Sequence, residues 1–487
     1  MLVLFGFRMI DSSVMKLESS YSNFIWSLDE DDKKKYYLTK RFLEIYTGND
    51  QLRNIINMGV PLETLDNNFK DTNLTLSDFL PIFDTSIVPT DLEKAEIEKK
   101  WPYANIWWRY VDTVQDFRKK ILETGSTNGL NNLFDVWRQR QINRTAFELG
   151  PKGSGIIHAP IAFELSDGCS VGCWFCGISA EKFKGHYSLK EDNGKEWKEI
   201  LHATKKILGS GMRSGFCYWG TDPLDNPEYL DILKIYDEIV GVVPQTTTAI
   251  PLKNIELTKS VLEFWKVKKN YPIRFSILTK AILQKVHDQF TAEELFGVEM
   301  VLQNTGAMHE TKTGAGRAYS AEKEKTFFKS TKSKKSKKVM SDATIACVSG
   351  FLINIVTKKI RLITPTLPSE EWKDGFKVIS ENTYSDPQNL HEIMIEMINT
   401  HMYSKINHLG KIKLNNTIRI TEDENVYFES PNVKMQFSYS KKILDLILSG
   451  KYSALDLVCN LTEDGTNPLE TFHLIDFLWM NGFIETE

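Results

Sequence analysis

The sequence predicts an α/β protein in three parts, and three observations support this prediction. From about residue 155 onward, short apolar runs alternate with stretches of helical periodicity, which is typical of parallel βαβ units. The preceding residues have helical spacing with little β-branched alternation, and the pattern changes again near residue 411. We therefore expect an N-terminal helical region at 1–154, a strand–helix domain at 155–410 and a small C-terminal module at 411–487.

The N-terminal region is expected to be helical because residues 29–52 and 90–122 carry charged and apolar side chains at helical spacing. Residues 101–110 are dense in Trp and Tyr. Two interpretations fit this aromatic stretch: a helix packed onto the next domain, or a wall of a peptide-binding site.

The central domain is expected to contain six strands with helices between them. Six such units fit a partial or full parallel barrel, whose active site lies where the strand C-termini meet the following loops. The expected strands are 161–165, 215–219, 245–249, 274–278, 298–303 and 344–348, and helices are expected at 197–208, 229–239 and 257–265.

The C-terminal module is predicted to hold three antiparallel strands followed by three helices. Residues 417–420, 426–429 and 433–437 alternate polar and apolar side chains, as half-buried strands do. The first helix, 441–448, stops at Gly450. Ser453 and Asp456 form a capping-box-like start for 454–461, and Asn467 with Pro468 opens the last helix, which Gly482 ends. This plan resembles a winged-helix module.

Composition excludes several classes of protein. The net charge is −4, from 60 basic and 64 acidic side chains, so nothing global indicates nucleic-acid binding. The longest apolar runs are too short to span a membrane, and the first ten residues are a poor signal peptide, with Met9 or Met15 as alternative starts. Six cysteines rule out a disulfide scaffold and indicate a reduced cytoplasmic protein.

Positions 325–338 hold seven lysines among fourteen residues, interleaved with Ser and Thr. This segment is interpreted as a solvated loop or as an electrostatic contact for an acidic partner.

Three cysteines form the strongest motif in the chain. Cys169, Cys173 and Cys176 have the spacing C-x3-C-x2-C directly after a predicted strand. Three thiolates on a tight loop suit a cubane iron–sulfur cluster and leave the fourth iron without a protein ligand. A structural zinc site, with His186 as fourth ligand, and chance clustering are the alternatives.

This motif resembles that of the radical S-adenosylmethionine (SAM) superfamily. The resemblance implies a partial (β/α)6 barrel, a [4Fe-4S] cluster on the three cysteines, SAM on the fourth iron and a 5′-deoxyadenosyl radical that removes a substrate hydrogen. Phe175, the aromatic residue before the third cysteine, is also typical of the motif.

The SAM contacts that the resemblance implies lie on three strands. The stretch WGTDP matches the glycine-rich element with an acidic residue for the SAM amino group, and it contains Gly220, Thr221 and Asp222. Asp222 stands where Glu is common, and the alternative is that it only caps a turn before Pro223. Arg274 and Ser276 share one strand face by alternation and are candidates for the ribose or carboxylate. Residues 246–248, three threonines, are further candidates.

The segments ELSDGCSVGCWFCG, FCYWGTDPLDNPEY, PQTTTAIPLK and IACVSGF resemble the radical SAM peptide epimerases, which convert L- to D-residues in ribosomally made precursor peptides. The resemblance covers roughly residues 100–370. The C-terminal module resembles the PqqD-like peptide-recognition element, which binds the precursor leader as an added strand at its sheet edge. The resemblance also implies an electron donor such as flavodoxin or ferredoxin. It implies no nucleic-acid partner and no membrane.

Epimerisation needs a hydrogen donor on the face opposite to abstraction, and a cysteine thiol suits this because its S–H bond is weak. Cys347 matches the donor cysteine of the epimerases, and we expect it at the C-terminal end of a late barrel strand. Cys217 and Cys459 are expected to be core residues. A related maturase that excises part of the peptide backbone and a non-catalytic leader-binding protein are the competing functions.

Overall fold

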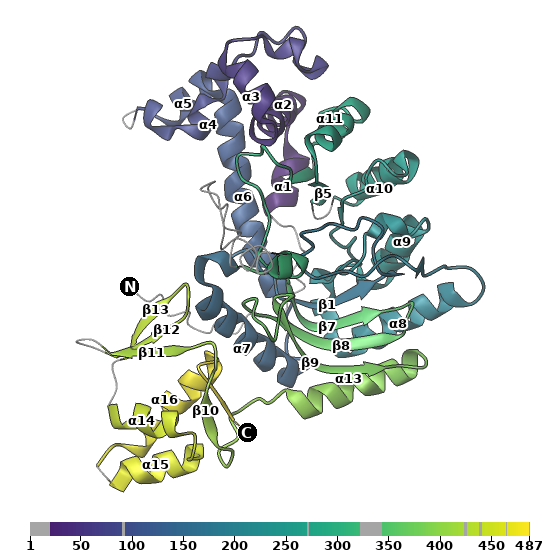
Figure 1. Ribbon diagram of the computed structural model, residues 1–487. Helices are drawn as coiled ribbons and strands as arrows, with labels where there is room; N and C mark the ends of the chain where they lie inside the picture. The colour runs from purple at the N-terminus through teal and green to yellow at the C-terminus, as the bar shows by residue number, and fades with distance from the viewer. Residues whose placement is uncertain are drawn as a thin grey trace, which may run out of the picture.

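The computed structural model describes residues 20–89, 93–269, 272–321, 343–422, 426–437, 441–463 and 465–486. The first ten residues and the lysine-rich stretch at 325–338 lie outside the described residues, so the interpretations of both stay predictions. The described chain is a mixed α/β protein whose three parts follow one another along the sequence (Figure 1).

The N-terminal region is helical, as predicted. The expected helix at 29–52 is divided at Asn49, whose backbone ends α2 and whose side chain accepts hydrogen bonds from the first amides of α3. The helices are α1 (Ser20–Ser27), α2 (Glu30–Gly48), α3 (Asp50–Asn57), α4 (Leu80–Phe83), α5 (Lys94–Lys100), α6 (Pro102–Thr124) and α7 (Asn132–Leu149).

The aromatic stretch at 101–110 opens α6 and packs inside the molecule. The rings of Trp107 and Tyr110 lie 6.3 and 5.1 Å from that of Tyr36 on α2, centroid to centroid. The Tyr110 hydroxyl donates to the Glu299 carboxylate at 3.2 Å, which ties α6 to the central domain. The interpretation of a helix packed onto the next domain is confirmed for these residues.

The central domain contains a parallel array of strands. Its members are β1 (Ala159–Glu164), β4 (Thr247–Thr248), β5 (Ile273–Ile277), β6 (Val298–Leu302) and β7 (Val348–Asn354). Phe216 forms single parallel bridges to Ala162 and to Gln245, so the order is β7, β1, the Phe216 segment, β4, β5, β6. The predicted strand at 215–219 therefore amounts to one bridging residue.

Helices α8 (Asn193–Leu208), α9 (Tyr229–Val240), α10 (Ile255–Lys268) and α11 (Lys280–Gln289) cover one face of this array (Figure 1). Phe163 of β1 packs edge-on against Trp197 of α8 at 5.0 Å, and Phe275 of β5 belongs to the same core. Successive strand side chains alternate, so Arg274 and Ser276 point to the opposite face, which we call the inner face.

Several elements of the central domain were not predicted. Strands β8 (Lys359–Pro365) and β9 (Phe376–Thr383) extend the sheet antiparallel from β7, and α13 (Pro387–His401) packs beside them. A short hairpin, β2 (Ser166–Asp167) with β3 (Gly185–His186), follows β1.

The prediction that Cys347 lies at the C-terminal end of a strand is wrong. The Ala346 amide donates to Thr344 Oγ1 at 2.9 Å, residues 343–347 have no regular structure, and β7 begins only at Val348. Val348 pairs with Ala159, the first residue of parallel β1. Cys347 therefore precedes its strand, at the N-terminal end.

The C-terminal module has the predicted plan. It contains β11 (Arg419–Glu422), β12 (Val426–Glu429), β13 (Lys434–Phe437), α14 (Lys441–Ser449), α15 (Ala454–Glu463) and α16 (Pro468–Met480). A further pair, β10 (Ile412–Leu414) with β14 (Ile484–Thr486), joins its two ends. The assignment of Cys459 to the core is wrong, because α15 buries its other face and leaves this thiol exposed.

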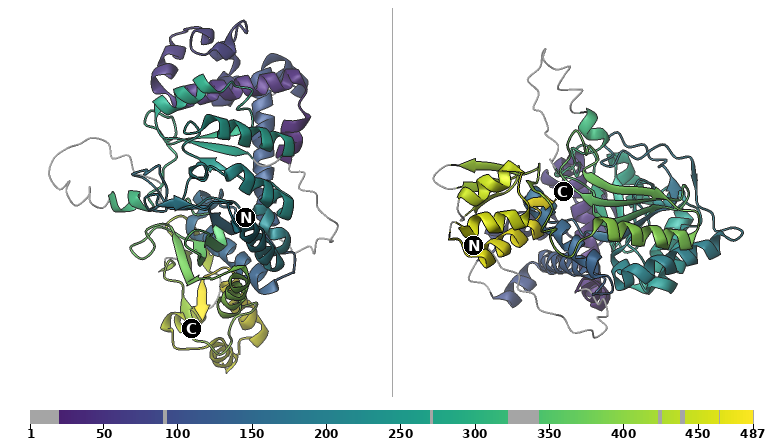
Figure 2. Two further views of the ribbon diagram at one scale, coloured as in Figure 1. Left: turned by 90° about the vertical axis from the view of Figure 1, so that its right-hand side faces the viewer. Right: turned by 90° about the horizontal axis from the view of Figure 1, so that it is seen from below.

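Helix α7 holds the module against the central domain (Figure 2). The Arg140 guanidinium lies 3.9 Å from the ring centroid of Trp479, and the Asn143 amide donates to the Met480 carbonyl at 3.1 Å. From the other side, Ser430 Oγ donates to the Phe147 carbonyl at 2.8 Å. These contacts fix the position of the module.

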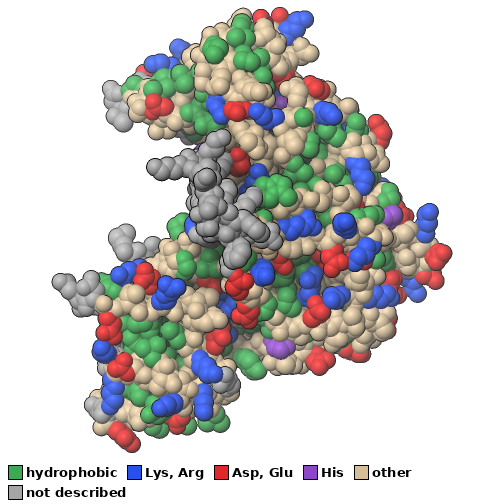
Figure 3. All heavy atoms as spheres, in the orientation of Figure 1, with side chains coloured by type: hydrophobic (Ala, Val, Ile, Leu, Met, Phe, Trp, Pro, Cys, Tyr) green, Lys and Arg blue, Asp and Glu red, His purple; other side chains and the backbone are tan. Residues whose placement is uncertain are grey.

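Charges of both signs are interspersed over the face of the molecule in Figure 3. Among the described helices, none is both long and apolar enough to cross a bilayer.

Removing the Arg144 charge should destabilise the fold. Arg144 on α7 is buried, forms an ion pair with buried Glu148 and donates to the Pro365 carbonyl at 2.5 Å. Arg144→Met leaves a buried carboxylate uncompensated, which costs about 3–5 kcal/mol. Urea unfolding followed by tryptophan fluorescence measures this loss.

The double variant Arg144→Met with Glu148→Gln is the control, since it removes both charges and should recover part of the lost stability. A single variant that unfolds at the native urea concentration would contradict the assignment.

Candidate active site

The three predicted cluster cysteines lie on one loop, residues 167–180, which we call the cluster loop. It starts at the carboxyl end of β1, after the short strand β2. Gly168 and Gly172 have φ values of 79° and 65°, a left-handed conformation that L-residues with side chains adopt at a cost. A Cβ on Gly168 would also strike the backbone of Lys182. Glycine at this position therefore permits the tight turn.

The thiols of Cys169, Cys173 and Cys176 are partly exposed, and Cys173 interacts electrostatically with both others. Burial raises the pKa of Cys169 to about 12 and also raises that of Cys173, so a metal must displace protons to bind. Within the described residues, no three His, Cys, Asp or Glu side chains are already arranged around a metal position. The three cysteines and their shared loop fit an iron–sulfur cluster, but their side chains are not arranged around a metal position in this structure.

Arg317 braces the cluster loop from outside. Its guanidinium donates to the Cys173 carbonyl at 2.6 Å and to the Ala180 carbonyl, and its own amide donates to the Cys176 carbonyl at 2.9 Å. A planar guanidinium can satisfy two carbonyls of a curved loop at once. Arg317 thus holds the second half of the loop in shape.

Asp225 anchors the first half of the loop. Its carboxylate accepts from the Ser170 amide at 2.9 Å and from the Ser170 hydroxyl at 2.5 Å, and Lys253 lies 2.7 Å away. Asp225 closes a short 3-10 helix, Pro223–Asp225, that follows the Phe216 segment. The cluster loop is therefore tied to the end of the neighbouring strand.

Phe175, the aromatic residue before the third cysteine, is buried and contacts exposed Trp174 edge-on. The Lys312 ammonium lies 4.8 Å from the Phe175 ring centroid and 5.5 Å from that of Trp174. These rings and the lysine close one side of the loop.

Asp222 is buried beside this loop and caps the 3-10 helix through the Leu224 amide at 3.0 Å. It also accepts from Thr248 Oγ1 at 2.8 Å and from the Ala249 amide at 2.7 Å. Asp222 therefore does cap a turn, and its contact with the SAM amino group stays a prediction. Burial raises the pKa of Asp222 to about 6, with the hydrogen bonds opposing that shift.

Gly220 and Thr221 directly precede Asp222 in the chain. The Gly220 amide donates to Glu164 Oε1 at 2.9 Å, and a Cβ there would lie 2.8 Å from this oxygen. The Thr221 hydroxyl is buried and has no hydrogen-bond partner in the structure. An orphaned buried hydroxyl beside the loop is a position at which a bound molecule could supply the partner.

Arg274 and Ser276 share the inner face of β5, as alternation predicted. Arg274 Nε forms an ion pair with Glu299 at 2.9 Å. Burial alone would lower the pKa of Arg274, but the attraction of the Glu299 carboxylate is larger, so the pKa of Arg274 is raised. Of the three threonines, only Thr247 is partly exposed. Thr246 is bonded to the Tyr229 hydroxyl and Thr248 to Asp222.

Cys347 faces the inner side of the array although it precedes β7. It interacts electrostatically with Arg274 and with Tyr218, whose hydroxyl bonds to Gln245. Burial raises the pKa of Cys347 to about 12, against the lowering effect of Arg274, so the thiol keeps its hydrogen at neutral pH. The other candidate thiol, Cys217, is fully buried in the core, as predicted.

A cleft of about 420 Å³ opens between the cluster loop and the extended part of the sheet, and we call it the loop-side cleft. Glu164 lies in it and receives Asn354 Nδ2 at 3.2 Å, with Arg361 at 3.5 Å. The cleft is also lined by residues 178–181, at and just after the end of the cluster loop, and by Asp374 and Phe376. His186, the alternative fourth ligand, is exposed on β3.

Glu164, Asp225 and Arg317 were not predicted. Glu164 carried a signal, since it is a charged residue inside the apolar run IAFEL. Nothing near Asp225 or Arg317 in the sequence indicates their contacts, because each reaches a loop 55 or 144 positions away.

The fold and the loop define a mixed α/β protein with a three-cysteine loop at the carboxyl end of a parallel strand array. No protein-family profile matches the chain. It is 34% identical over 395 residues to "Uncharacterized protein y4wI" of Sinorhizobium fredii (strain NBRC 101917 / NGR234), which covers 80% of this chain and 75% of that protein. The chain belongs to the family of this rhizobial protein.

A solved structure, "Crystal structure of BtrN in complex with AdoMet and 2-DOIA", aligns with a TM-score of 0.29 and 11% identity. The alignment covers 50% of this chain and 83% of that one. A TM-score of this size does not establish a shared fold.

Loss of the Arg317 side chain should loosen the cluster loop. Arg317→Ala removes two donors to loop carbonyls, so the three thiols should hold iron less well. Iron per chain after anaerobic reconstitution should fall at least about threefold, as expected when hydrogen bonds of roughly 1 kcal/mol or more are lost. The exposed Arg118, replaced by Ala, is the matched control and should load like the native chain. Equal loading of the two variants would refute the bracing role.

The burial of Asp222 should make stability depend on pH. The pKa of Asp222 is about 6 in the folded state, above its ordinary value of 3.8, so between these pH values the folded state holds a proton that the unfolded state has lost. The contribution to stability therefore decreases as pH rises from about 4 to about 6, by about 3 kcal/mol at roughly 1.4 kcal/mol per pKa unit.

Asp222→Asn cannot ionise, and thus its stability should lack this decrease. Urea unfolding of both proteins at pH 4, 5, 6 and 7.5 isolates the difference. Parallel curves over this range would show that Asp222 titrates normally.

Proposed function

We propose that the protein is a radical SAM enzyme that epimerises L- to D-residues in a ribosomally made precursor peptide. One observation carries the proposal: the C-x3-C-x2-C loop begins at the carboxyl end of β1 and is bonded through Ser170 to Asp225, three residues after Asp222. In this proposal the parallel array is the partial (β/α)6 barrel that the sequence resemblance implies.

The chain's own residues have the chemistry that the two cofactors require. Cys169, Cys173 and Cys176 would hold a [4Fe-4S] cluster, and three thiolate ligands suit that group. The unpartnered Thr221 hydroxyl and the inner-face Arg274 and Ser276 would face SAM. When bound, cluster and SAM supply a carbon radical that takes a hydrogen atom from the substrate.

In this proposal Asp222 has a structural role. Its carboxylate oxygens already accept three hydrogen bonds from protein groups. It therefore holds the Pro223–Asp225 turn against the end of β4 and leaves limited acceptor capacity for a SAM amino group.

Cys347 is the proposed hydrogen donor. Its S–H bond breaks and a Cα–H bond forms on the face opposite to abstraction, and the sulfur then needs one electron and one proton to return to the thiol. The raised pKa keeps the hydrogen on sulfur between turnovers. A donor such as flavodoxin or ferredoxin would supply the electron, and solvent the proton.

The position of Cys347 supports this role despite its place before β7. Ile345, two residues earlier, lies against Gly177 of the cluster loop, such that a Cβ on Gly177 would come 2.9 Å from the Ile345 side chain. The segment that carries the thiol thus runs beside the loop that would carry the cluster.

The C-terminal module is the proposed PqqD-like element for the precursor leader. Its docking on α7 would keep a bound leader at a fixed distance from the cluster loop. The proposed setting is the reducing cytoplasm, where free thiols persist.

Cys347→Ala should separate abstraction from return of hydrogen. The variant should bind iron and convert SAM to 5′-deoxyadenosine with the precursor present, yet yield at least about tenfold fewer D-residues, because the donor is absent. Chiral amino-acid analysis and peptide mass in D2O measure this. The native enzyme should add one deuterium per inverted residue.

Two controls bracket this test. Cys459→Ala removes an exposed thiol remote from the loop and should behave like the native enzyme. Replacing all three loop cysteines by Ala should abolish 5′-deoxyadenosine. A shortened peptide would instead indicate a backbone-excising maturase, and binding without SAM cleavage by the native protein would indicate a leader-binding partner.

A further inference from the structure

Glu164 is a buried carboxylate beside the cluster loop, and the proposed chemistry does not use it. It is the last residue of β1 and is only 5% exposed. It lines the loop-side cleft together with Gly220 and with Gly168, which directly precedes Cys169. A glutamate is rarely this buried unless it has specific partners. The partners of Glu164 therefore indicate what it does.

The Glu164 carboxylate connects two parts of the chain through its two oxygens. Oε1 accepts from the Gly220 amide at 2.9 Å. Oε2 accepts from Asn354 Nδ2 at 3.2 Å, and an Arg361 nitrogen lies 3.5 Å from the same oxygen. The Arg361 contact is long for a hydrogen bond, so the two amide donors make the closer contacts. A carboxylate can accept at both oxygens at once, which a side-chain amide cannot do.

Asn354, the last residue of β7, extends this connection to the start of the cluster loop. Its Nδ2 also donates to the carbonyl of Ser166, the residue directly before the loop, at 3.1 Å. Its Oδ1 accepts from the amides of Val356 and Thr357 at 3.0 and 2.9 Å. The orientation of the Asn354 amide is therefore fixed, with its nitrogen toward Glu164 and Ser166.

The other end of the connection is the segment Gly220–Thr221. A Cβ on Gly220 would lie 2.8 Å from Glu164 Oε1, so glycine permits the close approach of this backbone to the carboxylate. The next residue is Thr221, whose buried hydroxyl has no hydrogen-bond partner in the structure. Because the Gly220 amide is bonded to Glu164, the position of the Thr221 hydroxyl depends on Glu164.

The fold alone does not require a carboxylate at this position. Ala162, two residues earlier on the same strand face, packs in an apolar cluster with Trp219 and Phe376, so an apolar side chain at position 164 could extend that cluster. Replacing a buried charge and its partners by apolar groups is often neutral or stabilising. What Glu164 provides is a pair of directed acceptors between two segments.

We propose that Glu164 is a positioning residue that holds the Gly220–Thr221 segment at a fixed spacing from the cluster loop. This inference rests on the proposed function and deepens it, since Thr221 would face SAM while the loop would carry the cluster. Glu164 acts through the Gly220 amide on one side and through Asn354 on the other, and does not itself touch SAM.

Glu164→Gln tests this role. Whichever way the new side chain turns, its NH2 group meets another donor, either the Gly220 amide or Asn354 Nδ2. The anaerobically reconstituted chain, without reductant, should then bind SAM at least about tenfold more weakly in equilibrium dialysis, as expected when a buried donor is left unpaired. Iron per chain should stay native, because Arg317 and Asp225 hold the loop of cysteines.

A second substitution should rescue the first. With Asn354→Asp added to Glu164→Gln, the new amide nitrogen donates to the new carboxylate and the new amide oxygen accepts from Gly220. Asn354→Asp alone places two carboxylates side by side and should also weaken SAM binding. The double variant should bind SAM at least about threefold more tightly than either single variant, since the two positions are in direct contact.

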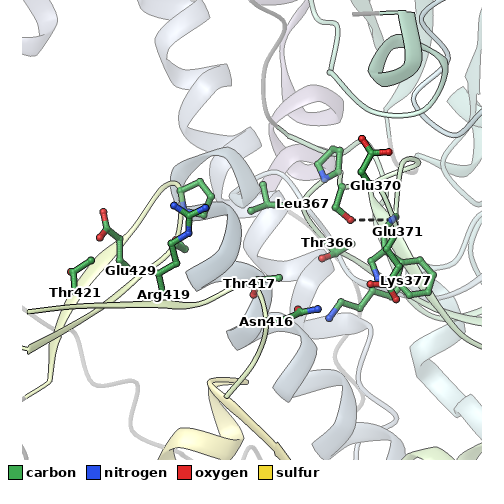
Figure 4. Close-up of a pocket in the computed structure, with 15 residues that line it drawn as sticks. Thr366, Leu367, Glu370, Glu371, Lys377, Asn416, Thr417, Arg419, Thr421 and Glu429 are labelled. Carbon is green, nitrogen blue, oxygen red and sulfur yellow. Dashed lines mark hydrogen bonds between the residues drawn. The ribbon is translucent and has the colours of Figure 1, made fainter. Parts of the chain in front are cut away.

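Glu429→Gln is the matched control. Glu429 is a partly buried glutamate that lines a separate cleft, of about 660 Å³, between the C-terminal module and the central domain (Figure 4). This variant should bind SAM like the native chain. Equal SAM affinity of the Glu164→Gln and Glu429→Gln variants, or no gain in the double variant, would overturn the inference.

The proposed function and the role of Glu164 give different results when they fail. A native reconstituted chain that holds iron but binds no SAM would refute both. A native chain that binds SAM, with the same affinity in Glu164→Gln, would refute the positioning role alone.

Discussion

The hold of Arg317 on the cluster loop is the interaction on which the candidate site depends. The loop carries three partly exposed cysteines, with left-handed glycines just before Cys169 and just before Cys173, and it has little regular structure of its own. Backbone carbonyls that point outward from such a loop need donors. Arg317 supplies them to Cys173 and Ala180, while Asp225 receives the Ser170 amide at the other end. Two charged side chains thus fix the loop before any cofactor binds.

Helix α7 connects the C-terminal module to the central domain that carries the cluster loop. One of its sides carries Arg140 and Asn143, which receive the C-terminal module, and the next turn carries Arg144 and Glu148. Glu148 accepts from Thr366, just after β8, and Asp374, just before β9, accepts from the cluster loop. A series of polar contacts therefore runs from the C-terminal module through α7 to the loop of cysteines.

The position of Cys347 before β7 changes the direction from which the proposed hydrogen donor would approach the substrate. A thiol at a strand's carboxyl end would lie on the rim with the cluster loop. Here it sits ahead of β7, and its thiol points to the inner face near Tyr218 and Arg274. The segment 343–347 passes beside Gly177, so the donor and the loop approach from two directions. Such an arrangement suits a reaction in which hydrogen leaves from one face of a carbon and returns to the other.

The sequence by itself determined the features that depend on neighbouring residues: the helical N-terminal region, the three-cysteine loop after β1, the shared face of Arg274 and Ser276, and the three strands and three helices of the C-terminal module. Local spacing, capping and alternation carry that information. Only the tertiary structure decided which distant groups meet. The bracing by Arg317, the anchoring by Asp225, the β8–β9 extension and the β10–β14 pair all join residues far apart in the chain. Cys347 lies at the other end of its strand from the expected one because pairing with β1 sets where β7 begins, and a single sequence does not reveal a pairing partner.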